Sequence, residues 1–557
     1  MKSEIVSAIG AAVEALFGQQ VAVELTRPDE QFGDFATNIA LQLSKQIQKS
    51  PREIAETLAE RLRSDLSAVV SELTVAGPGF LNLKLTDSAL IKLAQTEPAK
   101  SLENQVIVAE YSDPNPFKPL HAGHLYTTLV GDTISRLLEH AGAKTIRINF
   151  GGDVGLHVAR SMWAIVKDLG GESPEKLADI SEADRPKWLG ERYVEGNHAY
   201  EDDEQAKAEI IAINKRVYEL HATNDHDSAF AQIYWTCRTW SYDYFAILYQ
   251  QLQVKPFDRY IPESEVTALG LKTVQEQTEK GVYKESDGAI IFDGESLGLH
   301  NRVFINSNGL PTYEAKDVGL SLTKWRDYHF DTSIIITANE QMQYMQVVLA
   351  SIQKFAPEPA ERTKHLTHGF VKLQGGVKMS SRKGNVVTAL EILDAARAAG
   401  AEMGTNPTED TILAAIKYAF AKVRMGADIA YDPKESIALE GNSGPYLQYA
   451  HARARSILAK AGEADSQGDI QLEPDERSVI RKISEYAEAV DKAVYELMPH
   501  VICTYLYELA QTFNHFYERN RVIDDPRQSQ RVAIVAQYAD TLKSGLELLG
   551  ISAPNKM

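Results

Sequence analysis

Two histidines stand three residues apart in the segment His121-Ala122-Gly123-His124, directly after a stretch that Pro114, Pro116 and Pro119 keep out of helical conformation. At the start of a helix such histidines share one face, and the glycine between them lets a flat ring approach the backbone. Free N–H groups and the positive end of the helix dipole attract anions there, phosphate above all. The pattern predicts an ATP site whose histidines donate hydrogen bonds to phosphate. A surface helix start and half of a metal site are the alternatives, the metal being weaker because no further ligands lie nearby at recognisable spacing.

The elements around this turn form a strand, a helix and a second strand. Residues 106–109 are a short, apolar, β-branched run that predicts a strand buried on both faces. Apolar residues then recur at helical spacing from Leu125 to Leu138, with Gly142 placed to end a helix that starts near residues 119–121, and residues 145–150 predict the second strand. In such right-handed parallel units ligands bind beyond the carboxyl ends of the strands, which is where the histidine turn lies.

A segment near residue 380 completes a recognisable pair of motifs. HxGH at the start of a Rossmann helix, followed much later by Lys378-Met379-Ser380-Ser381-Arg382-Lys383-Gly384, resembles the signature of the class I aminoacyl-tRNA synthetases. The flanking sequences resemble the arginyl-tRNA synthetases in particular: EYSDPNPFKPLHAGHL (110–125), GGDVG (151–155), TYEAKDVG (312–319) and GPYLQYAHARARSI (444–457). The resemblance runs essentially end to end, with the motifs in family order.

The resemblance implies a reaction in which ATP and an amino acid carboxylate meet at the α-phosphate and pyrophosphate leaves. Cations and hydroxyl donors that tighten only in the transition state lower that barrier most, and Gly375-Gly376 is a suitable hinge upstream of them. A basic surface loop is the alternative interpretation of the KMS segment. The residues expected to bind ATP are Pro119, His121, Gly123, His124, Lys378, Met379, Ser380 and Ser381.

The KMS segment departs from the general KMSKS pattern. Ser381 stands at the fourth position, and the charge moves to Arg382 and Lys383. In arginyl-tRNA synthetases the absent lysine is commonly offset by one just before HxGH, a place that Lys118 occupies. We hypothesise that Lys118 and Lys378 clamp the triphosphate from opposite sides, so the expected catalytic residues are Lys118, His121, His124 and Lys378. Mg²⁺ is expected as a companion of the ATP phosphates, without dedicated protein ligands.

A second set of residues is suited to bind the arginine side chain. Tyr313 and Asp317 stand four apart and share a face if this segment is helical. A guanidinium is a planar fork of donors that carboxylates and amide oxygens bind best. Glu110 ends an apolar strand, where a solvated strand end is the alternative. The resemblance implies that these three residues and Asn115 hold arginine, and that Gln341 lies near the substrate. Asp153 is expected either in the substrate pocket or as a cap of the following helix.

Composition places the chain among soluble proteins. At 557 residues it exceeds one hydrophobic core and should divide into three or four domains, and 44% hydrophobic with 24% charged residues is ordinary for a globular protein. We find no apolar run of eighteen residues and no signal peptide, so we expect a cytoplasmic protein without a membrane partner. Cys237 and Cys503 are too few for a disulfide framework or for the zinc site expected of a synthetase for cysteine.

The predicted architecture is an α/β, Rossmann-type parallel-sheet catalytic domain with two additions. Residues 1–104 are expected to form a small N-terminal α/β domain, in which residues 21–25 alternate like a strand. The resemblance implies that this domain contacts tRNA, and a domain that only packs against the others is the alternative. Residues 105–389 are the catalytic domain, with a helical insertion at about 164–255 whose aromatic residues are more suited to a core than to ligand binding. Residues 390–557 predict an α-helical bundle that binds the anticodon.

The net charge of −19 argues by itself against a nucleic-acid partner, although a local basic strip suffices for phosphate contacts. In the C-terminal region Tyr446, Tyr449 and Arg453 form an aromatic and basic stripe at helical spacing. Such stripes bind splayed bases, and tyrosines packed between helices are the alternative.

The resemblance therefore implies an enzyme that attaches L-arginine to tRNA(Arg) with ATP and that needs bound tRNA for the first step, and we expect it to act as a monomer. A small-molecule nucleotidylyltransferase and a catalytically silent tRNA-binding paralogue are the rival functions. The first has no use for a long helical C-terminal region, and the second has no use for an intact HAGH, Lys378 and Glu110.

Overall fold

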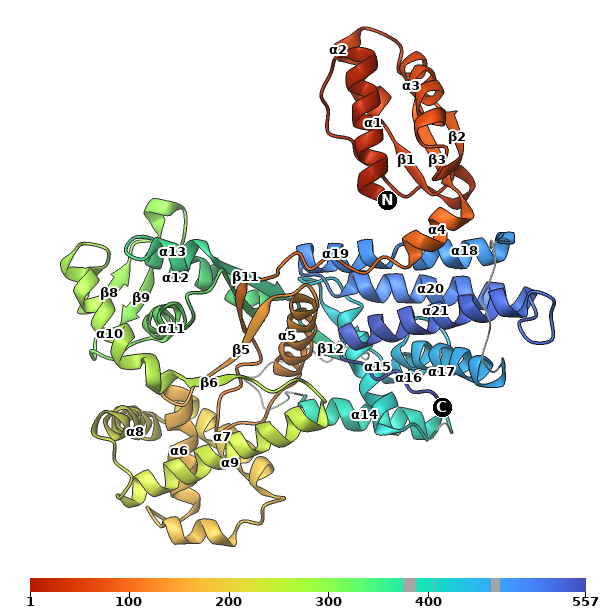
Figure 1. The fold of residues 1–557 in the computed structure, drawn as a ribbon. Coiled ribbons are helices and arrows are strands. Elements are labelled where there is room, and N and C mark those ends of the chain that lie inside the picture. The colour runs from red at the N-terminus through yellow and green to blue at the C-terminus, as the bar shows by residue number, and fades with distance from the viewer. Residues whose placement is uncertain (374–386, 405, 462–470) are drawn as a thin grey trace.

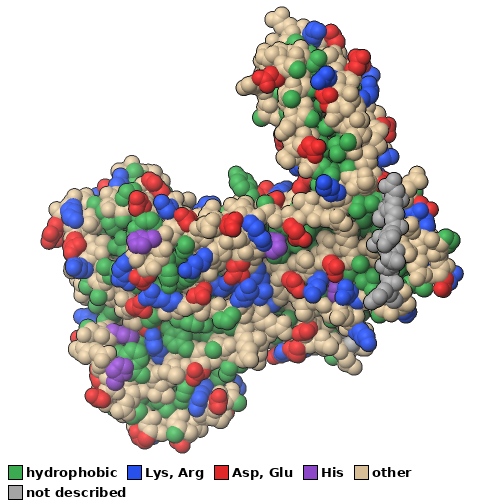
Figure 2. Space-filling model, in the orientation of Figure 1, with side chains coloured by type: hydrophobic (Ala, Val, Ile, Leu, Met, Phe, Trp, Pro, Cys, Tyr) green, Lys and Arg blue, Asp and Glu red, His purple; other side chains and the backbone are tan. Residues whose placement is uncertain are grey.

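The computed structural model describes residues 1–373, 387–404, 406–461 and 471–557. Its centre is a parallel sheet, with a small N-terminal α/β unit and a C-terminal group of helices on one side and two further groups of elements on the other (Figure 1). The N-terminal unit projects from the C-terminal helices, and acidic and basic side chains are interspersed on the face seen in Figure 2. Within the described ranges, no helix combines the length and apolar character needed to span a membrane.

The central sheet has five strands in the order β11-β10-β4-β5-β6, and every neighbouring pair is parallel. The strands are β4 (Val106–Glu110), β5 (Lys144–Gly151), β6 (Arg259–Pro262), β10 (Thr332–Ala338) and β11 (Thr363–His368). Helix α5 (Ala122–His140) connects β4 to β5, which confirms the predicted strand, helix and strand. After β4 the chain adds β5 and β6 on one side of it, and later adds β10 and β11 on the other side. The carboxyl ends of β4 and β10 are therefore at the switch point, where such sheets bind ligands.

A second, three-stranded antiparallel sheet lies outside the parallel one. It contains β7 (Lys284–Ser286), β8 (Ala289–Phe292) and β9 (Arg302–Ile305). Both β8 and β9 have residues that are not buried. Ile290 and Ile291 are only half-buried and Val303 is exposed, because an antiparallel sheet packs against the core with one face. The helices around it are α10 (Glu263–Glu279), α11 (Tyr313–Tyr328), α12 (Met342–Gln353) and α13 (Pro357–Glu361).

The segment between β5 and β6 is helical, as predicted. It contains α6 (Leu156–Asp168), α7 (Arg185–Asp202), α8 (Glu204–Thr223) and α9 (Ala229–Gln251), which form the lower-left part of Figure 1. Along α9, Tyr234, Phe245 and Tyr249 are buried. This confirms the core interpretation for these three aromatic residues.

The N-terminal unit packs helices on a three-stranded antiparallel sheet of order β1-β3-β2. Ser50 accepts a hydrogen bond from the Glu53 N–H, with Pro51 at the first helical position, so the start of α3 is specified locally. The predicted strand at residues 21–25 was wrong: these residues belong to no strand, and Thr26 pairs with Ala36 in an isolated bridge. The elements are α1 (Lys2–Phe17), β1 (Phe35–Thr37), α2 (Ile39–Ile47), α3 (Pro51–Asp65), β2 (Val70–Ala76), β3 (Phe80–Leu85) and α4 (Asp87–Ala94).

The described part of the C-terminal region is helical, as predicted, apart from one short strand. That strand, β13 (Ile429–Tyr431), pairs in parallel with β12 (Val371–Leu373). Arg477 joins this region to the N-terminal unit by ion pairs to Asp34 and Asp87. The helices are α14 (Ala389–Glu402), α15 (Glu409–Ala421), α16 (Pro433–Ile437), α17 (Gly444–Ala461), α18 (Pro474–Ile483), α19 (Tyr486–Glu496), α20 (His500–Arg519) and α21 (Gln528–Leu548).

Candidate active site

The histidine turn is built by the side chains of the motif itself. His121 is the N-cap of α5, and its Nδ1 accepts hydrogen bonds from the backbone N–H groups of Gly123 (3.1 Å) and His124 (3.3 Å). The two imidazole rings stack with centroids 3.7 Å apart. A Cβ on Gly123 would lie 3.0 Å from the His121 ring, so the glycine makes room for it. The expectation that these N–H groups are free for phosphate was therefore wrong, because a histidine acceptor already caps two of them.

Both rings of the turn are neutral at physiological pH. Burial, and then the positive charge of Lys118, lower the pKa of His121 to about 3. Burial also holds the pKa of His124 well below its usual range, helped by His121 and Lys118. Because Nδ1 of His121 accepts hydrogen bonds, the proton of its neutral ring lies on Nε2. The turn thus offers a neutral N–H donor, and the positive charge beside it is that of Lys118.

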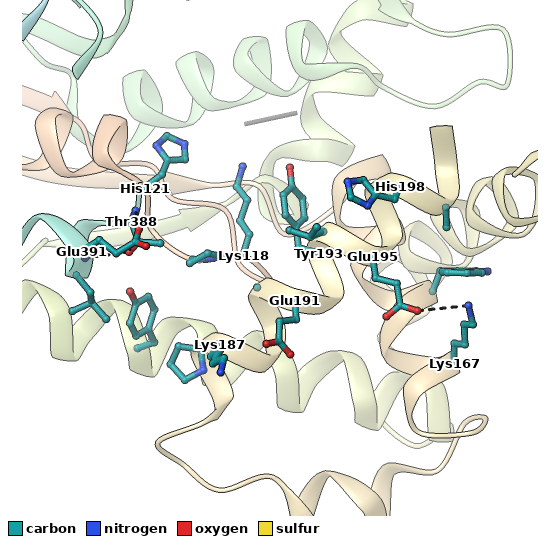
Figure 3. A pocket seen from close by; sticks show the side chains of 18 of the residues that line it. Lys118, His121, Lys167, Lys187, Glu191, Tyr193, Glu195, His198, Thr388 and Glu391 are labelled. Atoms are coloured by element: carbon teal, nitrogen blue, oxygen red, sulfur yellow. Dashed lines mark hydrogen bonds and ion pairs between the residues drawn. The ribbon is translucent and has the colours of Figure 1, made fainter. Parts of the chain in front are cut away.

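Lys118 lies at the edge of a cleft of about 1160 Å³ between the histidine turn, α7 and the start of α14. Its ammonium is 5.6 Å from the ring centroid of Tyr193, and Figure 3 shows it between His121 and Tyr193. Burial lowers the pKa of Lys118, while Tyr193 and Glu263 oppose the shift. Pro119 and His121 line the same cleft, so two of the residues predicted to bind ATP share one wall of it with Lys118, which was predicted as a catalytic residue.

The predicted KMS residues Lys378, Met379, Ser380 and Ser381 lie outside the described residues. The chain on either side of them contacts α5. Before them, Nε2 of His368 is 2.8 Å from Oγ1 of Thr127. After them, the N–H of Ala122 donates to the carbonyl of Val387, and the N–H of Ala389 donates to the carbonyl of Leu120, both at 2.9 Å. Both borders of the KMS segment are therefore fixed to the first turns of the HxGH helix.

Three carboxylates gather near the carboxyl end of β4. Glu110 is 3% exposed and accepts a hydrogen bond from Nζ of Lys324 at 2.5 Å, so the solvated-end alternative was wrong. Asp317 accepts a hydrogen bond from the Tyr344 hydroxyl. Asp113 accepts one from the N–H of Phe150 at 2.7 Å. Among the described residues, Lys324 is the cation bonded to this cluster.

The carboxylates interact electrostatically. Burial, and then the charge of Glu110, raise the pKa of Asp317 to about 8. Burial and Glu110 also raise the pKa of Asp113 well above its usual range. Like charges in a low-dielectric site oppose one another's ionisation, and one ammonium cannot offset three carboxylates. A bound cation with several N–H donors, such as a guanidinium, would both satisfy these oxygens and allow them to ionise.

The other residues predicted to bind arginine are placed differently. Tyr313 begins α11, is 50% exposed and lies 3.0 Å through its hydroxyl from Nδ1 of His157. Asn115 accepts a hydrogen bond from the N–H of Gly152 at 2.9 Å. Gln341 is exposed at the start of α12, one turn before Tyr344. The structure thus brings Glu110 and Asp317 together and leaves Gln341 at the surface.

Four residues of this region were missed from the sequence: Lys324, Tyr344, Asp113 and His157. Lys324 could have been found, because it follows Asp317 by two helical turns on the face that carries the predicted site. Nothing in the sequence pairs Tyr344 with Asp317 or His157 with Tyr313, because each pair joins separate elements.

Asp153 is not a helix cap. The N-cap of α6 is Gly155, and the Asp153 carboxylate is fully buried. It accepts hydrogen bonds from the N–H and hydroxyl of Ser264 (2.9 and 2.8 Å) and from Arg238 (3.0 Å). Asp153 therefore joins α9 and α10 to the end of β5.

The three residues predicted to form the anticodon-binding stripe lie in different environments. The Tyr446 hydroxyl accepts a hydrogen bond from Asn514 at 2.7 Å, so Tyr446 packs between helices. The Arg453 guanidinium lies 4.2 Å from the ring centroid of Tyr517, and Tyr449 is 45% exposed. A role of Tyr449 and Arg453 in binding tRNA stays a prediction. Among the described residues no group of three His, Cys, Asp or Glu side chains is arranged to hold a metal ion.

A parallel sheet with the HxGH helix at its switch point is the arrangement expected of a class I tRNA synthetase, and models of known families match along the chain. The model described as tRNA synthetases class I (R), catalytic domain, matches residues 86–427. The arginyl tRNA synthetase N terminal domain matches residues 1–85, and the DALR anticodon binding domain matches residues 447–557. The chain belongs to the arginyl-tRNA synthetase family.

Individual relatives agree with this assignment. The arginine–tRNA ligase of Bacteroides fragilis is 29% identical with 100% of both chains covered, and that of Porphyromonas gingivalis is 30% identical with 98% of both covered. The structure of the Thermus thermophilus arginyl-tRNA synthetase covers 100% of both chains with a TM-score of 0.81 and 26% identity. The structure of the Plasmodium falciparum enzyme, at 20% identity and a TM-score of 0.78, shares the fold.

Proposed function

We propose that the chain attaches L-arginine to tRNA(Arg). The arginine carboxylate attacks the α-phosphate of ATP, pyrophosphate leaves, and the 2′-hydroxyl of the terminal adenosine of the tRNA then takes the arginyl group from the adenylate and releases AMP. The observation that supports the choice of arginine is the cluster of Asp113 with the buried Glu110 and Asp317, in which Lys324 is the bonded cation of Glu110. This cluster lies at the start of the loop that ends in the HxGH turn, so one loop joins an amino acid site to a nucleotide site.

The residues of the turn have separate roles in this proposal. His121 and His124 donate neutral hydrogen bonds to phosphate oxygens, which needs no change of protonation during the reaction. Lys118 supplies positive charge from the side of the cleft, and Lys378 supplies it from the KMS segment. Mg²⁺ enters bound to the ATP phosphates, which are its usual partners.

The tRNA is part of the proposed mechanism as well as a substrate. We propose that adenylate formation needs bound tRNA(Arg), as it generally does in this family, with the exposed Tyr449 and the neighbouring Arg453 contacting the anticodon. We also propose that the protein is a cytoplasmic monomer, with domains divided near residues 104 and 389. Sedimentation of the purified chain with and without tRNA tests the monomer.

The deciding experiment is aminoacylation of total tRNA with each amino acid in turn. We expect charging with arginine alone, and arginine-dependent pyrophosphate exchange only when tRNA is added. Exchange that proceeds fully without tRNA would contradict the tRNA requirement. Turnover of ATP with no charging of any tRNA would favour a nucleotidylyltransferase, and tRNA binding without either reaction would favour a silent paralogue.

A further inference from the structure

A continuous path of hydrogen bonds links two of the predicted arginine-binding residues. Oδ1 of Asn115 accepts from the Gly152 N–H (2.9 Å), and the Gly152 carbonyl lies 2.7 Å from Nε2 of His157. Nδ1 of His157 lies 3.0 Å from the Tyr313 hydroxyl. The path therefore crosses from the loop after β4, over the end of β5 and the start of α6, to the first residue of α11.

The direction of each hydrogen bond follows from chemistry. A backbone carbonyl can only accept, so Nε2 of His157 carries the proton that it donates to Gly152. Burial, and then the charge of Lys118, lower the pKa of His157 to about 3, so the ring is neutral and its Nδ1 is an acceptor. The Tyr313 hydroxyl must then donate to His157. Its oxygen keeps lone pairs that can accept from a substrate N–H.

Gly152 holds the path together because no side chain fits there. A Cβ at this position would lie 2.6 Å from Oδ1 of Asn115 and 3.1 Å from Cε1 of His157. The close approach of both side chains to the Gly152 backbone thus depends on glycine. Tyr313 is 50% exposed, and its ring contacts Lys316 and His157. The hydrogen bond to His157 is what directs its hydroxyl.

We propose that His157 is a positioning residue of the amino acid site: it fixes the Tyr313 hydroxyl as an acceptor for a cationic substrate and couples it to Asn115. The inference rests on the proposed function, because it concerns the site that function assigns to arginine. It predicts that the loss of His157 acts on arginine binding through Tyr313 and leaves ATP binding unchanged.

The test measures aminoacylation kinetics of His157→Phe, which keeps a flat ring and removes both hydrogen bonds. We expect the KM for arginine to rise roughly tenfold, the change that one hydrogen bond near the upper end of its usual range produces, with the KM for ATP within about twofold of wild type. His157→Gln, whose amide offers one donor and one acceptor, should restore the KM for arginine to within about threefold. His226→Phe, at an exposed histidine between α8 and α9, is the matched control and should behave as wild type.

A double-mutant cycle separates positioning from general support of the fold. If His157 acts through the hydroxyl, Tyr313→Phe and the His157→Phe/Tyr313→Phe double variant should have the same KM for arginine within about twofold. Effects of the two substitutions that multiply would overturn the inference, as would a KM for arginine in His157→Phe equal to that of wild type. His157→Asn, too short to reach both partners, repeats the test if the phenylalanine variant does not fold. A wild-type protein that charges no arginine at all would contradict the proposed function instead.

Discussion

The two ends of the loop between β4 and α5 handle charge in opposite ways. At its start, Glu110 and Asp113 lie close to Asp317, and burial, followed by the charge of Glu110, raises the pKa values of both aspartates. At its end, His121 and His124 are neutral, capped and stacked before any ligand binds. The acid end is completed by a cation, whereas the histidine end is already organised. Under the proposed function, a cationic amino acid is selected by the repulsion that it relieves, and the nucleotide by donors that are fixed in advance.

The largest expected effect comes from the acid end. Glu110→Gln keeps the shape but leaves Lys324 as a buried ammonium without its carboxylate. We expect kcat/KM for arginine to fall roughly thousandfold and the free energy of unfolding to fall by about 3 kcal/mol. Aminoacylation assays and denaturant unfolding measure the two effects.

The matched control for this variant removes the ammonium too. Glu110→Gln/Lys324→Met should regain most of the lost stability, because no unpaired charge remains, while charging stays low. A single variant that charges arginine within tenfold of wild type would contradict the assignment of Glu110 to the amino acid.

A substitution of Lys118 tests the role of the positive charge beside the histidine turn. Lys118→Ala should lower arginine-dependent ATP turnover by roughly a hundredfold, because a charge placed against the phosphates is lost, with little change in the KM for arginine. Lys207→Ala, on the surface of α8 beside Glu204, is the control. Turnover within a few-fold of wild type would show that Lys118 does not replace the missing lysine of the KMS segment.

The affinity for arginine should depend on pH, because Asp317 has a pKa close to neutral pH. Below its pKa of about 8, Asp317 is protonated in the empty site, whereas bound arginine favours its ionised form. The affinity for arginine should therefore rise with pH, by at most about tenfold per unit, and level off above pH 8. Titration calorimetry from pH 6.5 to 8.5 measures this. The slope should decrease in Asp317→Asn without vanishing, because the pKa of Asp113 is raised as well. A flat wild-type profile would contradict the raised pKa of Asp317.

The same group has an opposite effect on the stability of the empty protein. A carboxyl whose pKa is higher in the folded state than in the unfolded state contributes stability at low pH and loses it as pH rises through the folded pKa. The contribution of Asp317 to the free energy of unfolding of the ligand-free protein should therefore decline as pH rises from about 4 to about 8. Bound arginine should raise the melting temperature more at pH 8 than at pH 6.5.

The smallest expected effect comes from substitutions of His121, the N-cap of α5. Asn is a good N-cap, so His121→Asn should keep the stability of α5 and lower ATP turnover by about tenfold through the lost ring donor. His121→Ala should lose the same donor and also about 1 kcal/mol of unfolding free energy. Equal stability of the two variants would show that the capping bonds of His121 contribute nothing.

Local sequence determined the parts of this protein that depend on neighbours along the chain. The β-branched run before Glu110, the prolines after it and the helical spacing from Leu125 to Leu138 were enough to place a strand, a loop and a helix start. The motifs were enough to name the family. Residues 21–25 alternate without forming a strand, because pairing needs a partner that alternation does not supply.

The tertiary structure alone decided which charges meet. Lys324 reaches Glu110 from another element 214 residues away in the sequence, Tyr344 reaches Asp317 from a different helix, and His157 reaches Tyr313 across 156 residues. Electrostatic and hydrogen-bond energies depend on distance and burial, which local spacing does not contain. The raised pKa of Asp317 and the neutral histidines of the turn follow from that burial and not from the residue types.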